Sequence, residues 1–570
     1  MAAPAPLLQK NDSIALISLS GVMVFVVQYV ARELDDNRLT SWQWVFQRAE
    51  PVQLFFVLAA GIAGAALFAG AAARIRPRPV ILFLICFLAG AAFWPEPEVI
   101  VDASRYFTQA KHLELYGLKH FIWAWGREIG VWTDLPLVPF LYGLAFRIFG
   151  EDRVCVQVLT TLFFSGGAVF TSLIGKELWD EETGFAGGML LLGIPYLFTQ
   201  VPLMLVDIPA MFFLMAAVYF FIRALRGGGW MAVLAAISIL AAFYAKYSNW
   251  LMLSVLVVVF MAELSRVWRS PGDRLRCIRT FITVAALACV MIGAVFLYKL
   301  DVFSGQIRFL MEYQKPGLQR WGESFLSTFF FQIHPLVTVA AAVSVYAAAK
   351  KKDASYLIVL WLVFVIFVLQ IRRIRYIVMV LPMFSLMAAY GLAMLKDASV
   401  RRFYVLCIVV SSLVVALGAF LPFLESMSAA NLKDAGAYLD TLQGRTAKVY
   451  VLRAENPALN PAVSVPLLDL FTGKQIAYSY SSGDFQQPLE KIEKSPLRFT
   501  WEYRNPNYYG EHNAEADIVV VISETGADPL PRDISQALEG YGLAKVFEVS
   551  ENVFQYRTSV RIYQKKGPSA

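Results

Sequence analysis

Long apolar runs alternate with short polar connections over most of the chain. A helix needs roughly 20 apolar residues to cross the hydrocarbon core of a bilayer, and about thirteen runs approach that length. The predicted spans are approximately 14–31, 53–73, 79–94, 154–174, 185–201, 208–224, 230–245, 249–264, 281–299, 328–348, 355–371, 376–395 and 403–423. The pattern therefore predicts a mainly α protein, a polytopic bundle of membrane helices.

A long loop from about Pro95 to Asp152 interrupts this pattern and is rich in Trp and Tyr. Within it, residues 137–149 form a short apolar piece that suits an interfacial or re-entrant segment better than a span. Amphipathic, Trp-rich sequence of this kind is typical of the headgroup boundary of a bilayer. We therefore expect the loop to lie where lipid and water meet.

The chain turns polar again from about residue 424 and stays so to residue 570. Apolar residues at helical spacing, with Gly444 as a C-cap, predict a helix at the start of this region. It is followed by strand-like runs at 447–454 and 517–523, a short helix at 534–540 and an alternating run at 554–564. We predict a membrane domain over residues 1–423 and a soluble C-terminal α/β domain over residues 424–570. About 145 residues are enough for a domain to bury its own core.

Composition excludes several classes of protein. The 570 residues are 58% hydrophobic and 16% charged, against roughly 45–50% and 25% in soluble proteins. A soluble enzyme, a disordered scaffold, a collagen-like rod and a disulfide-stapled secreted domain are all ruled out. The net charge of +7 forms no basic stripe with interleaved aromatic residues, so we expect no nucleic-acid partner.

Cysteine and histidine give no sign of a metal site or a disulfide framework. The cysteines lie in or beside apolar segments, and the histidines are scattered without ligand spacing: Cys86, Cys155, Cys277, Cys289, Cys407, His112, His120, His334 and His512. We predict no metal ligands from these residues.

The distribution of Lys and Arg predicts the orientation. Short loops dense in basic residues, such as 266–279 and 350–352, alternate with long loops that also carry many acids. Short basic loops lie on the cytoplasmic side of membrane proteins. We therefore expect the N-terminus inside and the residue 95–152 loop and residues 424–570 outside, which is periplasmic for a protein of the inner membrane.

The first candidate for chemistry is Asp102, just outside the third predicted span, with Arg105 and Tyr106 following it. An acid in such a loop is often a plain solvated residue. Here it lies in the aromatic loop, where it would face both water and the polar head of a lipid-borne substrate. We therefore regard Asp102 as a candidate catalytic carboxylate and Arg105 and Tyr106 as substrate-loop residues.

The second candidate is Asp207, near the middle of an apolar stretch that runs from Phe185 to Leu225. A carboxylate at the bilayer centre costs about 2.5–3.5 kcal/mol on the insertion scale. Pro202 and Pro209 favour a tight hairpin instead, with Asp207 at the outer surface. The alternative interpretation is a helix N-cap, since Asp shortly before Pro commonly opens a helix.

The third candidate is the basic group Arg372, Arg373 and Arg375, followed by Tyr376, on the predicted outer side. It runs against the positive-inside trend. Arg grips phosphate bidentately, so the group suits a phosphate ligand, although anionic lipid headgroups are an alternative. Lys246 lies at the outer end of the seventh predicted span, beside aromatic residues. It could help to bind phosphate, or it could extend from the helix end to the membrane interface.

In this order, these residues resemble the GT-C superfamily of integral-membrane glycosyltransferases, in the branch that holds the lipid A aminoarabinose transferases and the bacterial relatives of protein O-mannosyltransferases. The likeness covers roughly residues 79–395. It is carried by these segments: Asp102-Ala103-Ser104-Arg105-Tyr106, Leu135-Pro136-Leu137, Phe149-Gly150, Asp207-Ile208-Pro209, Lys246 and Arg375-Tyr376. Two features depart from the family pattern, because Ala103 stands where a second acid is usual and two spans precede the usual first one.

The resemblance implies transfer of a sugar, with inversion, from a polyprenyl-phosphate donor to an envelope acceptor on the outer face of the inner membrane. The acceptor would be lipid A, another glycolipid, a glycan or a protein. Asp102 would act as the base, Asp207 would orient the acceptor or share the catalytic work, and the arginines, Tyr376 and Lys246 would hold the donor phosphate. No cofactor is predicted, and the need for a divalent metal stays open.

Two other functions fit the composition. A transporter or flippase of lipid-linked glycans would carry ionisable or Gly/Pro-broken sites near the midplane, often in paired halves. This chain instead gathers its polar residues at the predicted outer surface and shows no repeat. A membrane anchor for the C-terminal domain would leave the arginine group and the aromatic loop unexplained. The enzyme is therefore the favoured hypothesis.

Overall fold

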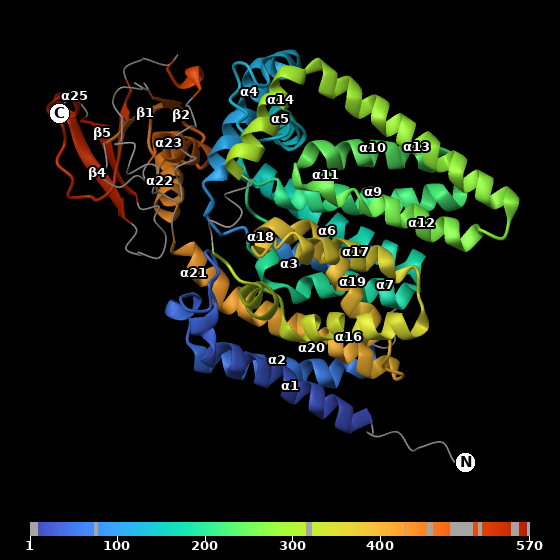
Figure 1. Ribbon diagram of the computed structural model, residues 1–570. Helices are drawn as coiled ribbons and strands as arrows, with labels where there is room; N and C mark the ends of the chain where they lie inside the picture. The colour runs from blue at the N-terminus through green and yellow to red at the C-terminus, as the bar shows by residue number, and fades with distance from the viewer. Residues whose placement is uncertain are drawn as a thin grey trace. The chain divides into compact units, whose positions relative to one another are not determined.

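The computed structural model describes residues 10–72, 78–314, 322–427, 429–452, 460–478, 506–510, 516–548 and 558–566 (Figure 1). His512 lies outside the described residues. The chain forms two compact units. The first, here the helical unit, comprises Met1–Phe93, Thr160–Pro202 and Val206–Phe423. The second, here the mixed unit, comprises Trp94–Leu159, Leu203–Leu205 and Leu424–Ala570.

The helical unit is built from helices alone among its described residues. They are α1 (Lys10–Val30), α2 (Pro51–Ala72), α3 (Pro79–Ala91), α6 (Arg153–Leu178), α7 (Glu181–Leu190), α8 (Pro195–Phe198), α9 (Asp207–Gly227), α10 (Trp230–Ala245), α11 (Ser248–Met252), α12 (Val255–Val267), α13 (Pro271–Tyr298), α14 (Leu300–Phe309), α16 (Pro335–Lys351), α17 (Tyr356–Val368), α18 (Ile374–Ile377), α19 (Leu381–Leu392), α20 (Ala398–Val415) and α21 (Leu421–Glu425). The predicted helical membrane bundle is confirmed.

Seven helical segments of the described chain are long and apolar enough to cross a membrane: Lys10–Val30, Arg153–Leu178, Asp207–Gly227, Ser248–Val267, Pro271–Tyr298, Ile374–Leu392 and Ala398–Glu425. Other predicted spans are shorter helices or are broken. The span predicted at 185–201, for example, divides into α7, a 3₁₀ turn and α8, which starts at Pro195. Because Pro lacks a backbone N–H and clashes with the preceding turn, it starts helices more readily than it continues them. The protein crosses the membrane several times, and thirteen spans stay a prediction.

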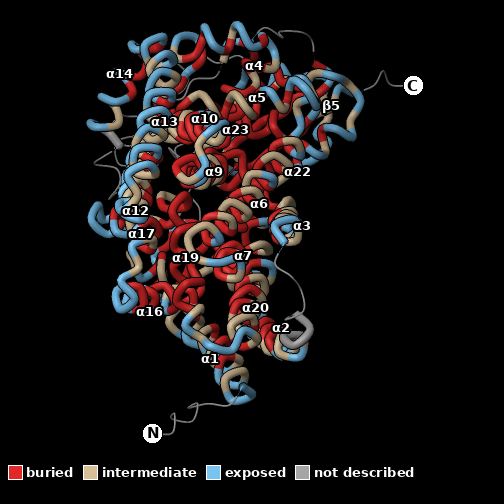
Figure 2. The backbone as a smooth tube through the Cα atoms, turned by 90° about the vertical axis from the view of Figure 1, so that its right-hand side faces the viewer, coloured by how far each residue is buried: buried red, intermediate tan, exposed pale blue. Residues whose placement is uncertain are grey.

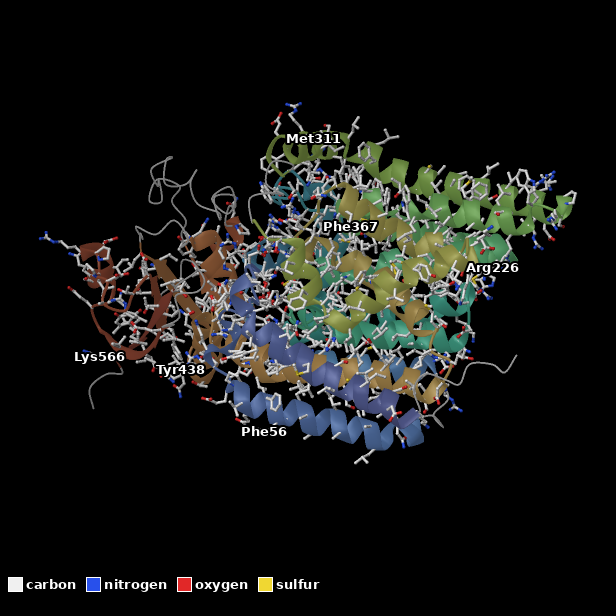
Figure 3. All side chains as sticks on the ribbon, turned by 60° about the horizontal axis from the view of Figure 1, so that its bottom comes forward. Phe56, Arg226, Met311, Phe367, Tyr438 and Lys566 are labelled. Carbon is white, nitrogen blue, oxygen red and sulfur yellow. The ribbon has the colours of Figure 1, made fainter. Side chains whose placement is uncertain are left out.

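Packing in the helical unit separates a buried centre from an apolar periphery. In the most apolar stretch of Ile374–Leu392, which contains α18 and α19, 89% is buried inside the structure. In the corresponding stretch of Pro271–Tyr298 only 11% is buried. Figure 2 shows α19 and α9 as buried and α13 as largely exposed. Apolar side chains such as Phe56 on α2 project from the unit (Figure 3). An exposed apolar helix surface of this kind is suited to lipid.

The helices α9, α10 and α13 pack side by side in the helical unit. α9 packs against α10, and α10 packs against α13 (Figure 1). Only Gly228 and Gly229 separate the end of α9 from the start of α10. A connection this short makes the two helices antiparallel neighbours, so the end of α10 returns to the start of α9.

The mixed unit contains a five-stranded sheet in the order β2-β1-β3-β5-β4. The strands are β1 (Thr446–Val451), β2 (Gln475–Ala477), β3 (Ile518–Ser523), β4 (Tyr541–Glu548) and β5 (Ser559–Lys565). β1 is parallel to β2 and β3, whereas β5 is antiparallel to β3 and β4. The central strand β3 reads IVVVIS and is buried throughout. The predicted α/β character of the tail is confirmed.

The helices of the mixed unit come from both the loop and the tail. They are α4 (Asp102–Ala124), α5 (Leu137–Phe149), α22 (Ala430–Thr441), α23 (Pro461–Leu470) and α25 (Arg532–Ala537). α4 packs on α5 and on α23. One expectation was wrong: α22 ends at Thr441 with Leu442 as its C-cap, and Gly444 (φ 104°) lies in the following turn. The division of the chain at residue 423 stays a prediction.

Candidate functional site

Asp207 is the first residue of α9, and its side chain is fully buried. Its Oδ1 lies 2.6 Å from Nζ of Lys246, and its Oδ2 lies 3.5 Å from Nε of Arg375. The N-cap position of α9 is Val206, and it makes no side-chain cap bond. The carboxylate therefore faces two cations and does not serve as the N-cap.

Three helix ends place these charges together. Lys246 follows the last residue of α10 and adopts extended backbone, while Arg375 lies in the short helix α18. Asn249 fixes the turn after Lys246, because its Nδ2 donates to the carbonyls of Ala210 (3.1 Å) and Ala242 (3.0 Å). A buried carboxylate is tolerated where charge partners satisfy it. The hairpin of α9 and α10 supplies one such partner, and α18 supplies the other.

The three predicted arginines do not act as one group. Arg375 turns to Asp207, and Nε of Arg373 lies 3.2 Å from Oε1 of Glu323. The Arg373 guanidinium also lies 5.3 Å from the ring centre of Tyr376. Arg372 is exposed, and its Nη2 donates to Oε1 of Gln370 over 3.2 Å. Arg373 and Arg375 are thus held in place by acids, whereas Arg372 stays accessible.

Glu323 is buried and was not predicted from the sequence. Burial raises the pKa of its carboxyl to about 7, although Arg373 beside it favours the charged form. Its Oε1 also accepts the backbone N–H of Arg38 over 3.4 Å. An acid with a pKa near neutrality that faces an arginine is the kind of group that gathers at functional sites.

The loop between α1 and α2 braces the segment that carries Glu323. The Asp35 carboxylate accepts hydrogen bonds from Ser327 Oγ (2.5 Å), Gln332 Nε2 (2.9 Å) and the backbone N–H of Trp42 (2.8 Å). Burial raises the pKa of Asp35 to about 6. The two additional N-terminal spans noted in the sequence therefore connect, through their loop, to the residues around Arg373.

In the mixed unit, Asp102 opens α4 and is half-buried. One turn later, Nη2 of Arg105 donates to Oδ1 of Asp134 over 2.7 Å, and its guanidinium lies 4.7 Å from the ring centre of Trp132. Gln109 Nε2 donates to the other oxygen of Asp134 over 2.9 Å. These contacts fix the first turns of α4, which carry Asp102.

Asp134 was not predicted from the sequence, and it is buried. Burial raises the pKa of its carboxyl to about 6; Arg105 opposes this shift, while the charge of Asp102 adds to it. Tyr106 is also buried, with its ring centre 5.3 Å from the Arg105 guanidinium. Arg105 and Tyr106 therefore support the helix from within, and Asp102 is the member of the motif with accessible surface.

Glu98, another acid of the loop, is committed to structure. Its Oε1 accepts from Nε of Arg153 over 3.0 Å, and its carboxylate also accepts the backbone N–H of Met204. Within the described part of the chain, no three His, Cys, Asp or Glu residues gather in a way that could hold a metal ion. The candidate residues form two separate groups, each within one unit: Asp207, Lys246 and Arg375 in the helical unit, and Asp102, Arg105 and Tyr106 in the mixed unit.

Comparison with known proteins gives a family match and a fold match. Residues 134–294 match the dolichyl-phosphate-mannose-protein mannosyltransferase family. The structure of ArnT from Cupriavidus metallidurans bound to undecaprenyl phosphate is similar at a TM-score of 0.51 and 14% identity, over 85% of this chain and 97% of that chain. The apo structure of the same protein is similar at a TM-score of 0.51 and 12% identity, over the same shares. The search of curated proteins finds no match.

The family match includes Asp207 and Lys246 of the helical unit, and Asp134, which accepts a hydrogen bond from Arg105. The fold match extends over 85% of this chain. The chain is therefore similar to this mannosyltransferase family over residues 134–294, and it shares the fold of ArnT over most of its length.

Proposed function

We propose that the protein transfers a sugar from a polyprenyl-phosphate donor to a hydroxyl or phosphate of an envelope acceptor, with inversion, on the outer face of the inner membrane. The acceptor class comprises lipid A, other glycolipids, glycans and proteins. The observation that carries the proposal is the convergence of Lys246 and Arg375 on buried Asp207. The undecaprenyl phosphate bound by the similar ArnT supports a lipid-phosphate donor.

The charge balance of the site suits a leaving phosphate. Four cations (Lys246, Arg372, Arg373 and Arg375) stand against two carboxylates (Asp207 and Glu323). A polyprenyl-phosphate sugar is a phosphodiester with one negative charge, and the released monoester carries roughly −1.5 to −2. Fixed cations therefore gain interaction energy as the bond to the sugar breaks, which is how a site favours the transition state over the substrate.

Activation of the acceptor falls to Asp102 in this proposal. A hydroxyl is a poor nucleophile until a base accepts its proton, and a carboxylate within hydrogen-bond reach can do so. Asp102 has exposed surface, whereas Asp207 is committed to Lys246 and Arg375. We therefore assign the base to Asp102 and the positioning of the two cations to Asp207, with orientation of the acceptor as its alternative role.

The alternative function is a transporter or flippase of lipid-linked glycans. The charges of the helical unit site lie at the start of α9, the end of α10 and the start of α18. Helix ends suit an interfacial site better than a midplane one, which favours the enzyme. A flippase would also need no acceptor and no base, so the loss of transfer by an Asp102 variant separates the two functions.

Cysteine labelling tests the proposed orientation. In a variant without native cysteines, we expect Ser304→Cys and Asp533→Cys to react with an impermeant maleimide in cells with a permeable outer membrane. Both positions are exposed, and both are predicted to lie outside. Lys351→Cys, exposed at the end of α16 in a short basic loop, is the matched control and should react only after lysis. The reverse pattern would overturn the orientation.

Donor affinity tests the role of Arg375. Arg375→Gln should weaken binding of a polyprenyl-phosphate sugar by about 10–150-fold, since a charge-assisted hydrogen bond is worth about 1.5–3 kcal/mol. Binding is measured with labelled donor and purified protein. Arg402→Gln, which removes a guanidinium paired with Glu182, is the control and should bind donor normally. If both variants bind the donor with equal affinity, Arg375 does not contact the donor and has a structural role only.

The pH dependence of donor binding tests Glu323. Its pKa of about 7 lies above the usual value, so between about pH 6 and 8 the carboxyl changes from largely protonated to largely charged. The charged form competes with the donor phosphate for Arg373. Donor affinity should therefore fall as pH rises through 7, and Glu323→Gln should remove this dependence. A wild-type profile that is flat from pH 6 to 8 would contradict the assignment.

A further inference from the structure

A cavity of about 310 Å³ lies in the helical unit between the start of α10 and the first half of α13. One wall carries Arg276, Arg279, Thr280 and Thr283, which recur at a spacing that puts them on one face of α13. The opposite wall is formed by Gly229 and Ala232. A Cβ placed on Gly229 would meet no atom within 4 Å, so the space beside this residue is open.

Most of the polar side-chain groups that line this cavity are hydrogen-bond donors. Arg276 pairs with Asp273 over 3.1 Å, and both side chains are about half exposed. The Arg279 guanidinium makes no hydrogen bond or ion pair with any residue that the structure describes. Two guanidiniums and the hydroxyl of Thr280 therefore line a space beside the Asp273 carboxylate, while the Thr283 hydroxyl donates to the carbonyl of Arg279 over 2.9 Å. Guanidinium and hydroxyl donors of this kind match the oxygens of a phosphate.

The cavity lies at the opposite end of α10 from Lys246. α10 has 16 residues and is therefore about 24 Å long, close to the thickness of a hydrocarbon core. Arg226, in the last turn of α9, lies at the same end of the α9–α10 hairpin as the cavity and is labelled in Figure 3. The cavity is thus separated from the donor site by most of a bilayer. It belongs to the side with the short basic loops, which is predicted to be cytoplasmic.

The surroundings of the cavity are apolar and aromatic. Trp230 is 66% exposed at the start of α10, Trp268 is 58% exposed just before α13, and Ile282 is 58% exposed on α13. Exposed Trp beside Arg is typical of the headgroup level of a membrane protein. A ligand held in the cavity by its phosphate would find apolar surface beside it for acyl chains.

We propose that this cavity binds the phosphate of an anionic lipid headgroup in the leaflet opposite the donor site. Arg276 and Arg279 bind the phosphate oxygens, and the hydroxyl of Thr280 donates a further hydrogen bond. The volume equals that of roughly ten water molecules, which is enough for a glycerophosphate group. This site is separate from the sugar-transfer site and does not depend on the proposed reaction.

Lipid binding by the full-length protein tests the proposal. Native mass spectrometry in detergent measures the affinity for phosphatidylglycerol and for zwitterionic phosphatidylcholine. Wild-type protein should bind phosphatidylglycerol more tightly. Arg276→Gln/Arg279→Gln should weaken that binding by about 30-fold, at about tenfold per 1.4 kcal/mol and about 1 kcal/mol for each basic residue at the membrane surface.

The matched control is Arg269→Gln/Arg274→Gln, which removes the same charge from the same segment but not from the cavity lining. This control should keep the wild-type affinity and preference. If both double variants bind phosphatidylglycerol equally, the attraction comes from overall charge and the proposed site is wrong. Excess inorganic phosphate should leave the bound lipid in place; displacement by phosphate would indicate a site for a soluble anion and overturn the assignment to lipid.

Discussion

Asp102→Asn is expected to lower the rate of sugar transfer by about 10²–10⁴-fold, the usual contribution of general-base catalysis. Asn keeps the size and the hydrogen-bonding capacity of Asp but cannot accept the proton of the acceptor. Folding should survive, because Arg105, Gln109 and Asp134 hold the first turns of α4 without it. The rate is measured in membranes with a labelled donor, and protein amount and thermal stability are measured in parallel.

Asp152→Asn is the matched control for this variant. Asp152 lies in the same long loop, and its Oδ1 accepts the N–H of Val154 at the start of α6 over 2.7 Å. Asn caps a helix as well as Asp does, so the control should transfer sugar at the wild-type rate. A stable Asp102→Asn protein that is as active as this control would remove Asp102 from the chemistry.

Asp207→Asn is expected to lower stability strongly and to reduce transfer as well. The substitution leaves Lys246, which is 21% exposed, without its buried partner; breaking a fully buried ion pair costs about 3–5 kcal/mol, and this partly exposed pair costs less than that. Without the carboxylate, Arg375 and Lys246 are also no longer held in the positions in which they would bind the donor phosphate. We expect a lower Tm in detergent and a weaker affinity for the polyprenyl-phosphate sugar.

Asp397→Asn distinguishes this role from helix capping. The Asp397 carboxylate does cap a helix, since it accepts the N–H groups of Ser399 and Val400 at the start of α20. Its replacement by Asn should leave the Tm unchanged. If Asp207→Asn has the same Tm and donor affinity as Asp397→Asn, Asp207 does no more than start α9, and the two cations do not depend on it.

The sequence predicts the fold class because hydropathy and length decide which segments enter a membrane. It does not predict where the helices break. Only packing shows that α19 begins at Leu381 after a 3₁₀ turn and that α8 is a single short turn that starts at Pro195. Gly444 shows the same limit in the tail, since a glycine with positive φ serves the turn before β1 as readily as a helix end.

The candidate site is predictable in part. The pairing of Asp207 with Lys246 follows from the hairpin, because two antiparallel helices joined by two glycines bring the residues at their far ends together. The partners Asp134 and Glu323 lie 29 residues beyond Arg105 and 50 before Arg373. No periodicity connects residues at such separations, and an acid in a polar loop is indistinguishable from a solvated one until the chain folds.

Mass spectrometry of envelope glycolipids and glycoproteins from a deletion strain tests the central claim most directly. The strain is complemented with the wild-type gene or with the Asp102→Asn variant. We expect one sugar to disappear from one class of acceptor in the deletion strain, to return with the wild-type protein and to stay absent with Asp102→Asn. Envelope glycans that are identical in all three strains, or restored in full by Asp102→Asn, would contradict a glycosyltransferase that uses Asp102 as its base.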